Sequence, residues 1–155
     1  MEMPKPGEKQ GKLKRMMGEW VGEERLHPSP FAQHGGVATG RVRNKLALDG
    51  FAIIQDYEQE RNGVANFTGH GIFTWNQEEQ CYMLYWFDSM GMPPSLFRGT
   101  FENEILTLTS KNAHGLTRAV FDFGKDSTYR YMMEMSPDGN QWTAFMEGHY
   151  ARKGF

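Results

Sequence analysis

The sequence predicts an all-β protein: an antiparallel, up-and-down β-barrel of about ten strands with a short N-terminal helix at the barrel base. The composition is rich in aromatic residues and Met, with 11 Phe, 6 Tyr, 4 Trp and 11 Met in 155 residues. Aromatic side chains favour strands over helices. Short alternating segments separated by turn residues fill the chain after residue 18. Their short connections predict a meander, which removes its exposed edges by closing.

One segment, residues 8–17, has the pattern of a helix. Leu13, Met16 and Met17 recur at the i, i+3, i+4 spacing of a helix face. Gly18 follows the last apolar residue and is a typical helix stop. Because this helix is short and amphipathic, we expect it to lie against the end of the barrel.

Ten strands follow, joined mainly by short turns. Asp49-Gly50, Asn62-Gly63 and the sequence Ser-Pro-Asp-Gly at 136–139 carry the turn chemistry that joins antiparallel strands. The strands are expected at 19–27, 37–48, 51–62, 64–75, 80–89, 95–102, 105–110, 115–123, 127–135 and 141–151.

Composition and charge exclude several classes of protein. The length predicts a single domain over 1–155. A net charge of -2 argues against nucleic-acid binding. No apolar run approaches the roughly 20 residues that a membrane helix needs, so no membrane partner is expected. The single Cys81 cannot form an internal disulfide, which is typical of a reducing compartment and predicts a cytoplasmic protein.

Catalytic and metal-binding patterns are weak in this chain. His27, His34, His114 and His149 do not share a spacing that places metal ligands side by side, so no metal is expected. No G-x-S-x-G motif occurs, and the serines have no partnered base in the sequence. We therefore assign no catalytic residue and favour a non-enzymatic protein, with an unrecognised enzyme as an alternative.

Strand alternation predicts a ligand site inside the barrel. A turn centred near Glu78 places His70 opposite Trp86, on a face that mixes apolar and polar side chains as ligand cavities do. We expect His70 and Asp88 to form a polar pair there. The predicted ligand-binding residues are His70, Trp86, Asp88, Trp142 and Met146. The reverse orientation, with His70 outside, is the alternative.

The ligand of such a site would be small and apolar or amphipathic. The loops at 28–36 and 90–94 are expected to form its rim. Arg118 and Arg130 lie within strands. If they face inward they favour an acidic ligand, and if they face outward they act as solubility charges.

The hairpin of the fourth and fifth strands also predicts a homodimer. Phe73 and Tyr85 lie on one of its faces, Ile72 and Trp86 on the other. One lumen cannot take both sets, and an uncovered set exceeds the apolar patch that monomers usually expose. A twofold contact is the commonest way to cover it. A barrel with a filled lumen that acts in protein contacts is therefore the alternative to ligand binding.

Two sequence features resemble known families. Gly18-x-Trp20 directly after a short helix resembles the signature of the calycin, or lipocalin-like, barrels, in which a late Arg stacks over the Trp; Arg152 is the matching residue here. The wider pattern includes Leu48-Asp49-Gly50-Phe51, Gly69-x-Gly71 and Trp86-x-Asp88. It is similar to the bacterial domain of unknown function 1579 over about 8–153. This resemblance implies a calycin-type barrel, often dimeric, and brings no established activity.

A more distant resemblance concerns haem. Gly18, Trp20, Gly22 and Pro28 match parts of the opening motif of the haem-binding nitrobindin barrels, although Glu24 and Leu26 interrupt it. In that group a late His holds the iron, and His149 lies near the equivalent region. Haem binding is therefore an alternative function, while the leading expectation includes no cofactor.

Overall fold

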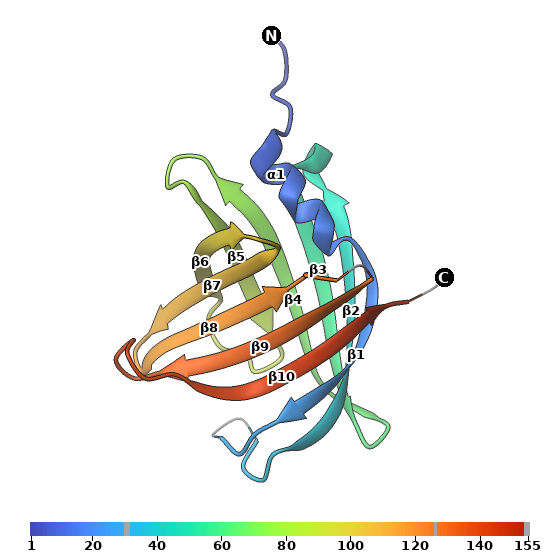
Figure 1. Ribbon diagram of the computed structural model, residues 1–155, viewed down its shortest axis with the longest axis vertical. Coiled ribbons are helices and arrows are strands. Elements are labelled where there is room, and N and C mark those ends of the chain that lie inside the picture. The colour runs from blue at the N-terminus through green and yellow to red at the C-terminus, as the bar shows by residue number, and fades with distance from the viewer. Residues whose placement is uncertain (30–31, 126, 154–155) are drawn as a thin grey trace.

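The computed structural model describes residues 1–29, 32–125 and 127–153, and it forms a closed antiparallel barrel of ten strands (Figure 1). This confirms the predicted fold class. The strands are β1 Gly18–Leu26, β2 Gly36–Ala47, β3 Ala52–Arg61, β4 Val64–Asn76, β5 Cys81–Asp88, β6 Ser95–Glu102, β7 Ile105–Asn112, β8 Gly115–Asp122, β9 Thr128–Ser136 and β10 Thr143–Arg152.

Each strand pairs with its neighbours in sequence, and β1 closes the barrel against β10. Consecutive hairpins therefore account for nine of the ten ladders, as a meander requires. In the closing ladder Trp20 lies directly opposite Arg152. None of the described helices is long and apolar enough to cross a membrane.

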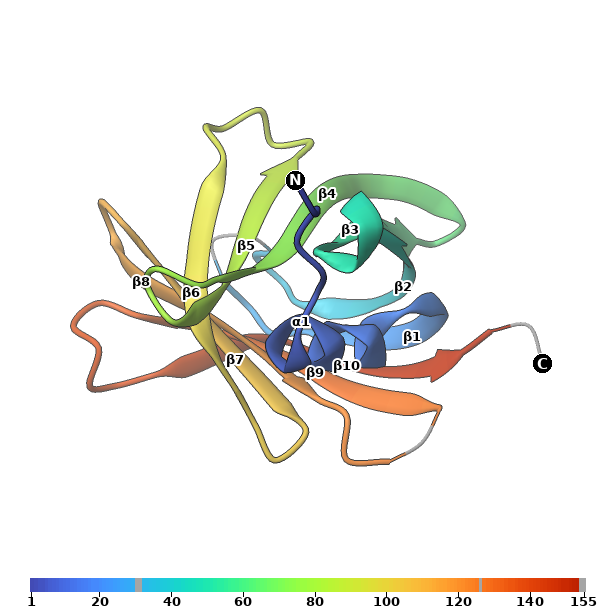
Figure 2. The same cartoon turned by 90° about the horizontal axis from the view of Figure 1, so that it is seen from above.

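A short helical segment covers one end of the barrel (Figure 2). It consists of the α-helix α1, Glu8–Lys12, and a 3₁₀ turn, Leu13–Met16, in place of one regular helix over 8–17. Leu13 and Met16 are both 1% exposed. The carbonyl of Met16 accepts hydrogen bonds from the Trp20 indole at 3.0 Å and from the Asn44 amide at 2.8 Å. The turn is thus fixed to β1 and β2 by both packing and hydrogen bonds.

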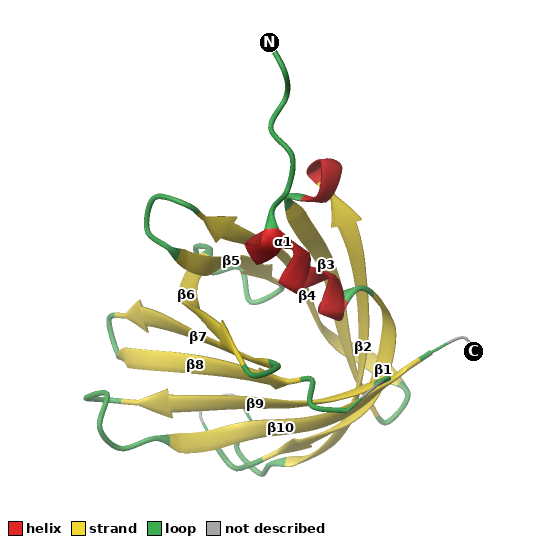
Figure 3. Cartoon of the chain, turned by 45° about the horizontal axis from the view of Figure 1, so that its top comes forward, coloured by secondary structure: helices red, strands yellow, loops and turns green. Residues whose placement is uncertain are grey.

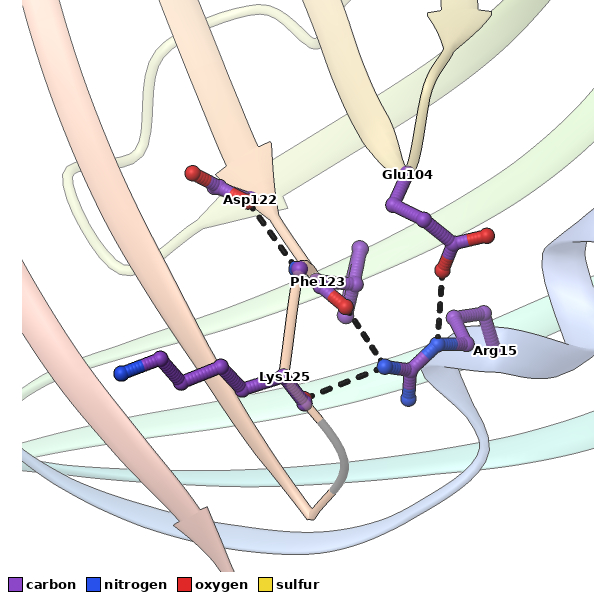
Figure 4. A network of polar contacts seen from close by, with 6 residues as sticks. Arg15, Glu104, Asp122, Phe123 and Lys125 are labelled. Carbon is purple, nitrogen blue, oxygen red and sulfur yellow. Dashed lines mark hydrogen bonds and ion pairs between the residues drawn. The ribbon is translucent and has the colours of Figure 1, made fainter.

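Arg15 ties the same turn to the opposite side of the barrel (Figure 4). Its guanidinium pairs with Glu104 at 2.9 Å and donates to the carbonyls of Phe123, at 2.5 Å, and Lys125, at 3.1 Å. These contacts join residues about ninety or more positions apart in sequence. The helical segment therefore closes this end as a fixed plug.

The inward-facing side chains differ in burial between the two ends of the lumen. The helical segment lies over one of these ends (Figure 3). At the plugged end, which we call the helix end, the inward-facing side chains form an aromatic core in which each is no more than 5% exposed. Trp20 lies edge-on to Tyr129, with ring centroids 4.8 Å apart, and Phe73 lies edge-on to Phe121. The helix end comprises Leu13, Met16, Trp20, Phe73, Phe121, Phe123 and Tyr129.

The register of β4 against β5 differs by one residue from the predicted register. Gly71, not His70, lies opposite Trp86, and His70 lies opposite Phe87. The turn spans four residues, 77–80, because the Asn76 side chain accepts the backbone N–H of Glu79 at 2.9 Å and so organises the connection. A slip of one residue moves a strand's whole side-chain set to the other face. The predicted inward orientation of His70 is therefore wrong.

This register also changes the argument for a dimer. Phe67, Phe73 and Trp75 of β4 share the lumen with Leu84 and Trp86 of β5, so the lumen takes the β4 members of one set and the β5 members of the other. The outer face of the hairpin keeps a smaller apolar set, in which Tyr85 is 41% and Phe87 48% exposed. The oligomeric state stays a prediction.

Candidate functional site

The barrel end opposite the plug is lined by inward-facing side chains that are only partly buried, in contrast to the helix end. The Tyr57 ring contacts those of Phe67 and Trp86, with centroids 5.9 and 6.2 Å apart. Met146 lies opposite Met133 in the β9–β10 ladder. We call this cluster the mouth; its residues are Tyr57, Phe67, Trp86, Tyr131, Met133 and Met146.

Trp86 occupies its place because the facing strand carries glycines. A Cβ added at Gly69 or Gly71 of β4 would overlap the indole of Trp86, so only glycine leaves room for this ring. The indole Nε1–H donates to the carboxylate of Asp88 at 2.9 Å. Asp88 also accepts the backbone N–H of Met90 at 3.0 Å. The first residues of the predicted 90–94 rim loop therefore hold Asp88 and Trp86 in position.

A buried carboxylate lies beneath the mouth. Glu24 of β1 is 0% exposed, and its carboxylate accepts hydrogen bonds from three donor groups. The Tyr57 hydroxyl donates at 2.7 Å, the Gln59 amide donates at 2.9 Å, and the Tyr150 hydroxyl donates to the other oxygen. Gln59 also contacts the Met146 sulfur at 3.8 Å. Tyr57 and Gln59 thus link the mouth to Glu24.

Burial and the Glu24 charge act on the surrounding phenols. Burial, followed by the negative charge of Glu24, raises the pKa of Tyr57, Tyr131 and Tyr150 above the ordinary value for tyrosine. These phenols are therefore neutral over the physiological pH range. A neutral phenol can donate its proton to the carboxylate, which is how Tyr57 and Tyr150 stabilise the buried charge.

The structure places the five predicted ligand-binding residues in two groups. Trp86 and Met146 face the lumen at the mouth, and Asp88 lies beside Trp86 at its rim. His70 faces outward, with its side chain 48% exposed, and its Nδ1 lies 2.7 Å from Asp56 instead of pairing with Asp88.

Trp142 also lies away from the lumen. It precedes β10, and the guanidinium of the outward-facing Arg118 lies 3.9 Å from its ring centroid. A bulge between Ala144 and Met146 breaks the alternation on which its predicted inward orientation depended. The structure therefore does not bring Trp142 to the mouth.

The two structural residues meet at the helix end. Trp20 is 1% exposed, and the guanidinium of Arg152 lies 4.2 Å from its ring centroid. Arg152 also donates to the carbonyl of Met17. This is the arrangement that the calycin resemblance implies, with the cation above the indole face.

The charged residues that would recognise an acidic ligand or haem face away from the lumen. Arg118 pairs with Glu134 at 2.9 Å, and Arg130 lies opposite Asp122, both on outward positions. His149 is exposed between the inward-facing Gly148 and Tyr150, so its imidazole does not fit iron ligation in the lumen. Within the described residues, no group of three His, Cys, Asp or Glu side chains is arranged to hold a metal ion.

A large cavity lies on the outer face of the barrel, not in the lumen. It is a groove of about 710 Å³ across β1 to β5, and we call it the outer groove. Arg41, Arg43, Asp56, His70 and Phe87 line it. A smaller cavity, about 150 Å³, lies near Lys12 and Phe101.

Sequence reasoning missed the network beneath the mouth. Glu24 was noted only as an interruption of a glycine motif, although it lies two alternation steps after the inward-facing Trp20. A carboxylate at an inward position of a strand is a signal that partners must exist, because an unpaired buried charge is too costly. Tyr57 and Gln59 are two residues apart on β3, so the same alternation places both side chains on the inward face.

Fold and site together define a calycin-type barrel, plugged at one end and lined by aromatic and Met side chains at the other. Residues 5–152 match the family described as "Protein of unknown function (DUF1579)", and the chain belongs to this family. A comparison with curated protein sequences finds no match.

Two solved structures share the fold. The crystal structure of Rv2717c from M. tuberculosis superimposes with a TM-score of 0.74 at 12% sequence identity, covering 96% of this chain and 99% of that chain. The S-type phycobiliprotein lyase CPES from Guillardia theta gives a TM-score of 0.63 at 10% identity, covering 97% of this chain and 99% of that chain. At these identities the similarity shows the fold alone.

Proposed function

We propose that this protein binds a small apolar or amphipathic molecule at the mouth of the barrel. The observation that carries the proposal is the contrast between the ends of the lumen. Inward-facing aromatics are sealed at the helix end, whereas Tyr57, Trp86 and Tyr131 are partly exposed at the mouth. Apolar walls with a few placed polar groups are typical of ligand sites.

Methionines give the mouth the means to adapt to a ligand. The outer groove lies outside the lumen, and the occupant of the mouth enters by displacing side chains. Met133 and Met146 are unbranched and flexible, and can change rotamer at low cost. Trp86 and Phe67 provide flat apolar surfaces against which a ligand can pack.

The experiment that tests this proposal uses the neutral probe N-phenyl-1-naphthylamine. We expect its fluorescence to rise on binding the native protein, with quenching of tryptophan emission. Trp86→Ala should weaken binding about tenfold, because a full aromatic contact is worth about 1–2 kcal/mol. Trp142→Phe is the matched control and should leave binding unchanged. Equal affinities for Trp86→Ala and the native protein would refute binding at the mouth.

The second candidate function is contact between two copies of this chain through the outer groove. Outward residues of four adjacent strands alternate between acidic and basic types across it, in the order Glu19, Arg43, Asp56, His70. A twofold axis along the strands between β2 and β3 places Arg43 of one copy opposite Asp56 of the other, so the row complements itself.

Sedimentation at low and high salt tests this contact. The charge pattern predicts a dimer whose dissociation constant rises with salt, because exposed charges are screened. The double variant Arg43→Glu and Arg41→Glu should give a monomer. A native protein that is monomeric at every salt concentration would remove this candidate.

A further inference from the structure

The hydrogen-bond donors of the mouth are already paired with protein acceptors. The Tyr57 hydroxyl and the Gln59 amide donate to Glu24, and the Trp86 indole donates to Asp88. What these groups can still offer a ligand is acceptor atoms, chiefly the free lone pairs of the Asp88 carboxylate, because the Tyr57 oxygen already accepts from the Gln59 amide at 3.3 Å. The Tyr131 hydroxyl, which can donate or accept, is the exception.

The buried charge beneath the mouth is negative. Glu24 is surrounded by neutral donors, and it has no ion pair within the described residues. Arg61, at the end of β3, donates instead to the carbonyl of Gly35 at 2.8 Å. Arg152 lies at the helix end over Trp20. In a poorly solvated lumen this leaves a negative potential that neutral hydrogen bonds do not cancel.

The aromatic rings add to the same preference. The face of an aromatic ring carries negative charge density and attracts cations, most strongly for Trp. Tyr57, Phe67 and Trp86 are neighbours at the mouth, and Tyr57 donates to the Glu24 carboxylate. An ammonium group among these rings would meet both the ring faces and the potential of Glu24.

We propose that the ligand of the mouth carries a hydrogen-bond-donating, positively charged group, such as a protonated amine, on an apolar body. This inference rests on the proposed function and names the chemical class of its ligand. It excludes fatty acids and other apolar carboxylates as the preferred ligands. The outward positions of Arg118 and Arg130 agree with this exclusion, because neither guanidinium is available to a carboxylate in the lumen.

The test compares three probes with the same chain and different head groups: decylamine, decanol and decanoate. Calorimetric titration at neutral pH, below the micelle concentration of each probe, gives their dissociation constants. We expect decylamine to bind at least about tenfold more tightly than decanoate, with decanol between them.

Two variants that each remove one negative charge test which carboxylate causes the preference for decylamine. Glu24→Gln should lower the affinity for decylamine about tenfold and leave decanol unchanged, since only the cation responds to the lost charge. Asp88→Asn, at the rim and outside the buried network, should lower it about threefold, which keeps the test valid if Glu24→Gln folds poorly. Glu58→Gln, on the outer face, is the matched control and should change nothing.

The outcomes separate this inference from the proposed function. Binding of none of the three probes would overturn both. Equal binding of all three, or tightest binding of decanoate, would overturn the cation preference and leave binding at the mouth intact. Tightest binding of decylamine that neither Glu24→Gln nor Asp88→Asn reduces would also overturn the assignment.

Discussion

The two ends of the barrel are built from similar residues and differ in what completes them. At the helix end, Leu13, Met16 and Arg152 enclose Trp20, whose indole nitrogen donates to the Met16 carbonyl. At the mouth, Trp86 packs on glycines and donates to Asp88, and none of the helices in the described residues covers it. A high content of aromatic residues therefore does not distinguish the sealed core from the mouth. The difference is that the helical segment covers only the helix end.

The largest expected effect is the difference in stability loss between substitutions of Trp20 and Trp86. Trp20→Ala should lower the free energy of unfolding by about 3–5 kcal/mol, because it leaves a cavity in a sealed core. Trp86→Ala should cost about 1–2 kcal/mol, since the mouth can relax and admit water. Urea denaturation of both variants measures the difference. Equal costs would contradict the distinction between the ends.

The second largest expected effect is the loss of stability when the hydrogen-bond network around Glu24 is broken. Glu24→Ala leaves the Tyr57, Gln59 and Tyr150 donors without their acceptor, and we expect a loss of about 2–4 kcal/mol. Glu58→Ala on the outer face should change stability by less than about 0.5 kcal/mol. A Glu24→Ala protein as stable as the native one would show that the network does not support the fold.

High pH should weaken the barrel through its buried phenols. The pKa values of Tyr57, Tyr129, Tyr131 and Tyr150 are raised, first of all by burial. The unfolded chain releases these protons near pH 10, while the folded protein retains them. Their stabilisation is therefore complete below about pH 10 and falls above it, by up to about 1.4 kcal/mol per tyrosine per pH unit.

Chemical denaturation between pH 9 and 11.5 checks this dependence, with phenolate absorbance recorded in parallel. The Tyr57→Phe variant is the control, because its stability should fall less steeply by one proton's contribution. A stability that is constant or rises over this range would contradict the burial of these hydroxyls.

Arg152 should contribute a smaller amount to the helix end. Arg152→Ala removes the cation over Trp20 and a hydrogen bond to Met17, for an expected loss of about 0.5–2 kcal/mol. Arg43→Ala breaks an exposed pair with Glu19 and should cost about 0.5 kcal/mol or less. The thermal midpoints of the two variants measure both losses. A larger loss for Arg43→Ala than for Arg152→Ala would refute the role of Arg152.

The smallest effect belongs to His70. Because His70 faces outward beside Asp56, His70→Leu should leave the affinity for a neutral lumen probe unchanged and shift stability by no more than about 0.5 kcal/mol. Titration of N-phenyl-1-naphthylamine against the variant measures this. A clear loss of affinity would place the binding site on the outer groove instead of the mouth.

Much of the fold follows from local chemistry. The Gly18-x-Trp20 motif after a short helix, the turn at Ser136–Asn140 and the strand spacing are all short-range patterns, and the structure contains each of them. At that turn the Asp138 carboxylate accepts the backbone N–H groups of Asn140 and Gln141, which lowers its pKa.

The site was harder to predict because orientation depends on single-residue details. A shift of one residue in the β4–β5 register places His70 outward, and one bulge in β10 places Trp142 away from the lumen. Trp86 and Met146 face the lumen as predicted, because alternation is regular within β5 and, in β10, from Met146 onward after the bulge. The Glu24 network joins β1, β3 and β10, and no local pattern reports such a long-range cluster.

The methionine methyl groups provide the most direct test of the account's central claim, that a ligand enters at the mouth and leaves the helix end unchanged. Met133 and Met146 lie at the mouth, Met16 lies in the sealed core, and Met92 is 70% exposed outside. Methyl NMR spectra of the ¹³C-methionine-labelled protein during decylamine titration should show shifts for Met133 and Met146, with Met16 and Met92 unchanged. Shifts confined to Met92, or equally large at Met16, would contradict the claim.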